Sequence, residues 1–219
     1  MRPEPGEIER ALHDLRRGRA LVLIDDDSRG DDSRGGGGGD LVFAAQLATA
    51  SLMAFVVRHS SGFVCVALPD RDADRLGLPA MWPYRDRPGP AYAVTVDAAD
   101  NGTGISAADR TRTVRLLAAD TTTADALARP GHIVPIRVGS GRLFGRPFGP
   151  AEAAHELVRR AGLRPVGVLA SVVSRRRPTE MADAAELREF AAEHGLSCVR
   201  IQALLAHLDA APQPTARAG

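Results

Sequence analysis

Apolar positions recur along this chain at alternating helical and strand spacings. Ile8, Ala11, Leu12 and Leu15 lie three or four residues apart, and Gly18 follows as a stop signal. Short apolar runs predict strands over residues 20–24, 63–68, 92–96, 133–138, 166–173 and 198–201. Further helices are predicted from Thr49 or Ser51 to His59, from Ser106 past Leu117, over 151–160 and 184–194, and up to about Leu208.

This interleaving of strands and helices predicts one mixed α/β (α+β) domain, a single sheet with flanking helices. The near-continuous apolar run over residues 166–173 is typical of a strand buried on both faces. We expect the domain to cover residues 5–208. The Pro- and Ala-rich segment 209–219 is expected to be a disordered tail.

The segment from Asp25 to Asp40 has an unusual composition. It repeats Asp-Asp-Ser-Arg-Gly over residues 26–30 and 31–35, and glycines occupy every position from 35 to 39. Ordering so many glycines is entropically unfavourable, which favours a mobile loop. A phosphate-cradling loop is the alternative, although no Gly-Lys-Ser helix start follows.

Composition and charge narrow the possible functions. Of the 219 residues, 44% are hydrophobic and 25% charged, and the net charge is +1, so no global field attracts nucleic acid or an acidic membrane. Aromatic residues make up 4%, which disfavours a base-stacking platform. Cys65 and Cys198 have apolar neighbours and are expected to be buried thiols. Without an apolar leader or membrane-length stretch, we expect a cytoplasmic protein.

Five segments together resemble one enzyme family. They are Gly18–Asp26 with Gly39–Ala45, Arg58–Val66 with Arg75–Pro79, Gly102–Arg110, Arg129–Pro135 and Ala161–Val168. In this order they are similar to the 3,4-dihydroxy-2-butanone 4-phosphate synthases of riboflavin biosynthesis. The resemblance spans about residues 5 to 208. A fused cyclohydrolase domain, which some members carry, is not expected because the sequence ends at Gly219.

The resemblance implies a homodimer with sites near the subunit interface and a magnesium-dependent reaction. Family members convert ribulose 5-phosphate to 3,4-dihydroxy-2-butanone 4-phosphate and formate. That chemistry needs a base to remove a carbon-bound proton, a cation beside the enediolate, and donors for the phosphate. No nucleic-acid or membrane partner is expected.

The first loop departs from the family pattern Asp-Arg-Glu-Asn-Glu-Gly-Asp. Arg34 and Asp40 match the substrate-binding arginine and final aspartate, but glycines 35–38 stand where the two glutamates belong. Gly35 therefore occupies a magnesium-ligand position without a donor side chain. Aspartates of the same loop are candidate replacements, namely Asp25, Asp26, Asp27, Asp31 and Asp32.

Two later motifs depart as well. Pro150 replaces the metal-binding histidine of Gly-His-Thr-Glu-Ala, while Arg146 matches the phosphate-side arginine. Ala170-Ser171 replaces a Cys-Glu pair whose glutamate the family needs for catalysis. The acidic loop that follows becomes Ser174–Pro178, which is either a solvated basic loop or a site for a phosphate or an acidic partner.

Several matched residues keep their chemistry. His132 occupies the place of an essential family histidine, and Cys65 matches a site-lining cysteine; these two are the catalytic candidates, although a packed thiol explains Cys65 equally well. Thr103 is a substrate-binding candidate with Arg34, Asp40 and Arg146. Ser106 has a suitable hydroxyl but also fits a helix cap.

These replacements favour a diverged synthase homologue whose standard activity is impaired or lost. Two alternatives stay open: altered chemistry on a related sugar phosphate, and a non-enzymatic partner that modulates an active synthase. A working synthase whose loop aspartates bind the metal is a further possibility.

Overall fold

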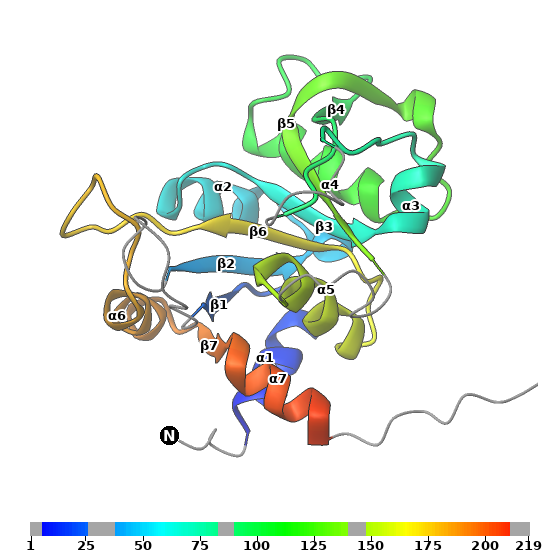
Figure 1. Cartoon of the computed structure of the whole chain (residues 1–219). Helices are drawn as coiled ribbons and strands as arrows, with labels where there is room; N and C mark the ends of the chain where they lie inside the picture. The colour runs from blue at the N-terminus through cyan, green and yellow to red at the C-terminus, as the bar shows by residue number, and fades with distance from the viewer. Residues whose placement is uncertain (1–5, 26–37, 83–89, 140–147, 211–219) are drawn as a thin grey trace, which may run out of the picture.

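The computed structural model describes residues 6–25, 38–82, 90–139 and 148–210. Its centre is one seven-stranded sheet with the order β4-β5-β3-β6-β2-β1-β7 (Figure 1). The strands are β1 (Leu21–Ile24), β2 (Gly39–Ala44), β3 (Cys65–Pro69), β4 (Val96–Ala98), β5 (Leu127–Val138), β6 (Gly167–Ser171) and β7 (Ser197–Arg200). The expected mixed α/β fold with a single sheet is confirmed.

Helices cover both faces of the sheet. They are α1 (Glu7–Arg16), α2 (Ala50–His59), α3 (Asp70–Arg75), α4 (Ala107–Ala118), α5 (Pro150–Arg160), α6 (Ala184–His194) and α7 (Ile201–Ala210), with 3-10 turns η1 (Ala45–Leu47) and η3 (Ala124–Ala126). Figure 1 shows α5 crossing in front of β2 and β6, with α1 and α7 beside β7.

Two apolar clusters fill the layers between sheet and helices. One contains Phe43 and Val66 from the sheet with Met53 of α2 and Leu187 of α6. The other contains Val42, Cys65, Val134 and Leu169 from the sheet together with residues of α1, α5 and α7. Neighbouring residues of a strand therefore enter opposite clusters, as the two-residue period of a strand requires.

The helix starts follow the expected capping chemistry. The Thr49 hydroxyl accepts the Leu52 N–H at 3.1 Å, and the Ser106 hydroxyl accepts the Asp109 N–H at 3.0 Å. Asp183 caps α6 by accepting from Ala185 and Glu186, and Gly195 ends that helix with φ of 60°. Thr49, not Ser51, is thus the cap of α2.

The expected boundaries were wrong in several places. The loop expected to run to Asp40 ends before Gly39, and Gly39–Ala44 form a fully buried strand, β2, which pairs with β1 and β6. β5 begins at Leu127, six residues before the expected start, because Pro-Gly reads as a turn in isolation. The strand expected over 92–96 is shifted to Val96–Ala98. α7 continues to Ala210, so the first two residues of the expected tail are helical.

A close backbone approach fixes the β4–β5 pair. A Cβ atom added to Gly131 would lie 2.0 Å from the Val96 carbonyl carbon and 2.2 Å from the Asp97 nitrogen. The Gly131 N–H also donates to the Thr95 hydroxyl at 3.1 Å. All of these atoms belong to the backbone, which cannot move aside as a flexible side chain can, so only glycine fits this position.

We therefore expect Gly131→Ala to destabilise the protein by about 1–3 kcal/mol, the usual result of overpacking. Gly102→Ala is the matched control, since a Cβ there meets nothing within 4 Å. Urea unfolding of both variants measures the difference. Equal stability of the two variants would contradict the role assigned to Gly131.

Candidate active site

Four polar or thiol side chains share one face of the sheet. The apolar cluster that includes residues of α5 is called the α5-side cluster. Asp40, Ser171 and His132 lie two residues from its members Val42, Leu169 and Val134, respectively. Cys65 belongs to that cluster itself. Because residues two apart on a strand point the same way, all four face the α5 side.

The strand register places these residues at one end of the sheet. Asp40 is paired with Ser171, and Cys65 is paired with both Leu169 and Val134. Ser171 lies two residues beyond Leu169 on β6, and His132 lies two residues before Val134 on β5. The predicted site residues His132, Cys65 and Asp40 therefore lie on the same face and at the same end of four adjacent strands, and Asp40 is close enough to Cys65 to affect its pKa.

Asp40 is a buried carboxylic acid. Its residue is 7% exposed, and the Ser171 hydroxyl donates to Oδ1 at 2.7 Å. Burial raises the pKa of Asp40 from 3.8 to about 6; the Ser171 hydrogen bond opposes this shift and the nearby Asp25 charge adds to it. A pKa close to neutral suits a group that both takes up and releases a proton.

Cys65 is a buried thiol in the same region. Burial raises its pKa to about 12, and the neighbouring Asp40 charge adds to the shift. At neutral pH the sulfur therefore stays protonated, whereas a nucleophilic cysteine needs the thiolate. A protonated thiol favours a packing role for Cys65 in the lining of the site. Its catalytic role stays a prediction.

His132 is held by a partner that the sequence analysis did not name. Its Nδ1 lies 2.6 Å from Oδ2 of Asp97, and its backbone N–H donates to Oδ1 of the same carboxylate at 3.1 Å. The signal available in the sequence was an acidic residue within an apolar stretch, Val94–Ala98. That signal is weak without knowledge that β4 pairs with β5 beside His132.

The remaining site candidates divide into described and undescribed positions. Thr103 is exposed in the turn before α4, and Ser106 serves as the α4 cap. Arg34, Gly35 and Arg146 lie outside the described residues. Pro150 is the first residue of α5, where its side chain offers no metal donor.

The described ranges contain no group of three His, Cys, Asp or Glu placed to hold a metal. Of the aspartates considered as replacement ligands, Asp25 is described and lies near enough to Asp40 to raise its pKa. The other four, at positions 26, 27, 31 and 32, fall outside the described residues. No described helix is both long and apolar enough to cross a membrane.

The arginines of the basic loop over residues 174–178 pair with acids of α6 and of the segment just before it. Arg175 pairs with Glu193 at 2.7 Å, Arg176 pairs with Glu189, and Arg177 pairs with Glu180 and Asp183 at 3.2 Å each. The Ser174 hydroxyl donates to Glu186 at 2.7 Å. These internal ion pairs favour a solvated loop anchored to its own helix over a phosphate site.

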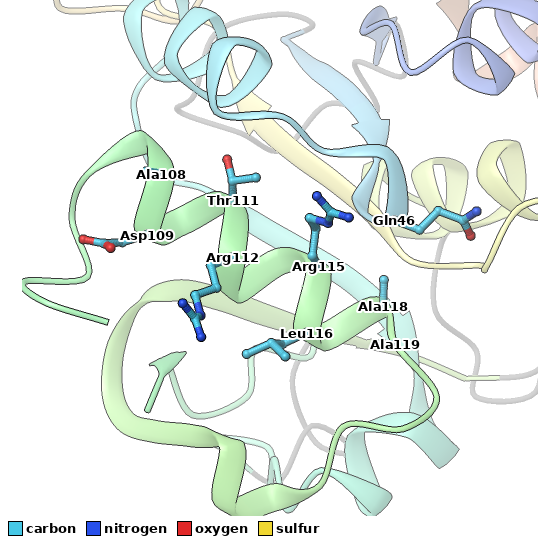
Figure 2. A pocket seen from close by; sticks show the side chains of 9 residues that line it. All are labelled: Gln46, Ala108, Asp109, Thr111, Arg112, Arg115, Leu116, Ala118 and Ala119. Atoms are coloured by element: carbon cyan, nitrogen blue, oxygen red, sulfur yellow. The ribbon is translucent and has the colours of Figure 1, made fainter. Parts of the chain in front are cut away.

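A separate open hollow of about 660 Å³ lies along α4. Figure 2 shows its lining side chains, which come from α4 and the following residue, with Gln46 opposite them. Asp40, Cys65 and His132 are not among the lining residues, so this hollow is distinct from the sheet-end site.

The model of the 3,4-dihydroxy-2-butanone 4-phosphate synthase family matches residues 9–207. The chain belongs to this family. The riboflavin biosynthesis protein RibBA of Nocardia farcinica is 48% identical over 201 residues, which are 91% of this chain and 47% of that protein. RibBA of Mycobacterium tuberculosis is 47% identical over 200 residues, 90% of this chain and 45% of its own. The chain thus spans about half the length of these curated relatives.

Solved synthases share the fold. A crystal structure of the Candida albicans synthase has a TM-score of 0.81 and 38% identity, and covers 92% of this chain and 96% of its own. Another synthase, solved in complex with two magnesium ions, has a TM-score of 0.80 and 36% identity, with the same two coverages. The two-domain RibBX synthase of A. baumannii has a TM-score of 0.84 and 30% identity, and the match covers 94% of this chain and 59% of that chain.

The burial of Asp40 predicts a pH dependence of stability. Its folded-state pKa lies above the ordinary 3.8, so its stabilising contribution is complete below about pH 4 and is lost as the pH rises through about 6. A shift of about two units corresponds to about 3 kcal/mol. Asp40→Asn should therefore lose much less stability than the parent between pH 4 and 7, measured by urea unfolding.

Asp100→Asn is the control for this comparison, because Asp100 is exposed and pairs with Arg112. It should retain the pH dependence of the parent protein. If Asp40→Asn and the parent lose equal stability over this interval, Asp40 is not the buried acid described.

Proposed function

We propose that this chain is a sugar-phosphate-binding member of the synthase family, of riboflavin-pathway descent, in which the standard reaction is impaired. That reaction converts ribulose 5-phosphate to 3,4-dihydroxy-2-butanone 4-phosphate and formate. The observation that carries the proposal is the donor set of the sheet-end site. Asp40 is hydrogen-bonded to Ser171, which replaces a family glutamate, and Pro150 replaces a family metal ligand.

The proposal covers only the half of the RibBA relatives that this chain spans. The homodimer, the cytoplasmic location and the domain bounds 5–208 stay predictions. Sugar phosphate is the ligand class that family membership supports, and His132 with Asp40 retains groups able to move protons beside it.

Magnesium is the family cofactor, and one solved relative is a complex with two magnesium ions. The described residues of this chain do not fit a preformed site for it. Asp40 is buried with one carboxylate oxygen already accepting from Ser171, and the side chain of Pro150 supplies no lone pair. Magnesium needs several oxygen ligands in near-octahedral geometry, and the described residues contain no group of three His, Cys, Asp or Glu placed to hold it.

A second candidate is acid–base chemistry on a related sugar phosphate without formate release. The pKa of Asp40 near 6 and the retained imidazole of His132 favour it. Such a site would still exchange a proton on the carbon next to a carbonyl, which is the first event of enediol formation.

Incubation of the protein with ribulose 5-phosphate and magnesium in D₂O, followed by proton NMR, separates these functions. We expect formate release at least about 100-fold slower than that of a family member with an intact motif set, since removing one acid–base group typically lowers a rate by about 10²–10⁴-fold. Deuterium incorporation without formate would indicate the second candidate. Formate release near the rate of the intact enzyme would overturn impairment.

Calorimetric titration with Mg²⁺ tests the missing donors directly. We expect no saturable binding by the parent protein, and a gain of binding in the double variant Gly35→Glu with Pro150→His, which restores a carboxylate and an imidazole at the two ligand positions. Pro150→Ala is the matched control and should bind no better than the parent. Saturable binding by the parent that Asp25→Asn abolishes would show that loop aspartates replace the lost ligands.

A further inference from the structure

One carboxylate contacts His132 at two points. Oδ2 of Asp97 lies 2.6 Å from ring atom Nδ1, and Oδ1 accepts the backbone N–H at 3.1 Å. Two contacts from one rigid group define both the backbone position and the ring orientation of the histidine. Among the described residues, Nε2 of His132 makes no hydrogen bond.

The surroundings hold this pair closely. The Asp97 side chain is 11% exposed and that of His132 is 39% exposed, so the carboxylate is covered while the ring edge remains open. Gly104, with φ of +77°, packs against both: an added Cβ would lie 2.1 Å from Oδ2 of Asp97 and 2.9 Å from Nδ1 of His132. Only a glycine lets this turn close over the hydrogen bond.

A buried cation lies beside the carboxylate. Burial lowers the pKa of Arg110, and the nearby Asp97 charge acts in the opposite direction. Nη1 of Arg110 donates to the Gly62 carbonyl at 3.0 Å, and its Nε has no hydrogen-bond partner. The guanidinium therefore places a positive charge close to the Asp97 side chain.

We propose that Asp97 is a positioning residue that holds neutral His132 as the Nδ1–H tautomer. A carboxylate beside Nδ1 requires the proton on that nitrogen, so the lone pair is left on Nε2 at the open edge of the ring. Nε2 is thereby prepared to accept a proton from a bound ligand. The tautomer follows from the contacts alone, whereas its use on a sugar phosphate rests on the proposed function.

Long-range ¹H–¹⁵N spectra of the full chain labelled at histidine nitrogens test this assignment. In mildly alkaline buffer, where imidazoles are neutral, we expect the His132 pattern to show a protonated Nδ1 and an unprotonated Nε2. His132→Gln identifies which signals belong to this residue. A proton on Nε2 of His132 in the parent protein would overturn the proposal.

Asp97→Asn distinguishes positioning from mere packing. The amide keeps an oxygen for the His132 N–H but presents an N–H to Nδ1, so the proton should move to Nε2 while the shape of the side chain is preserved. Asp100→Asn, a surface change in the same turn region, should leave the tautomer as in the parent. An unchanged tautomer in folded Asp97→Asn would count against the proposal, because packing alone would then set it.

The same samples separate this inference from the proposed function. Addition of ribulose 5-phosphate should shift the Nε2 signal of the parent and leave Nδ1 bonded to Asp97. An Nδ1–H tautomer with no response to the sugar phosphate would sustain the positioning role and reject that ligand. An Nε2–H tautomer with a clear ligand response would do the reverse.

Discussion

The antiparallel register between β2 and β6 is the constraint on which the candidate site depends. It pairs Asp40 with Ser171, residues 131 positions apart in the chain, and allows the 2.7 Å hydrogen bond between them. Because strand side chains alternate, a slip of one residue would turn Asp40 into the opposite apolar cluster. The buried runs on both strands disfavour that slip, so the apolar core also fixes the position of the acid.

Under the proposed function, this chain keeps side chains able to transfer protons but lacks side-chain donors for a cation at two positions. The imidazole of His132 and the carboxyl of Asp40 face the α5 side of the sheet. The Ser171 side chain offers a hydroxyl, which donates to Asp40, and the Pro150 side chain offers no metal donor. Metal coordination and proton transfer need different numbers of ligands. A site can therefore lose metal coordination while individual side chains remain able to transfer protons.

Much of the fold could be predicted from local pattern, because caps and apolar spacing are local properties. Thr49, Ser106 and Gly195 marked helix ends through backbone chemistry that acts within four residues. β2 and the early start of β5 were missed, since their strand character comes from partners distant in sequence. Asp97 was missed for the same reason. Its importance arises only when β4 lies against β5 and its carboxylate meets His132.

The arginines of the 174–178 loop are paired with acids of α6 and of the segment between the loop and that helix. A surface whose positive charges are locally cancelled projects little field into solvent. An incoming phosphate ester would therefore meet this side of the molecule by ordinary diffusion, with little long-range attraction from this loop. Salt slows an association that is steered by charge. We therefore expect the ionic strength to have little effect on how fast a ligand reaches this surface.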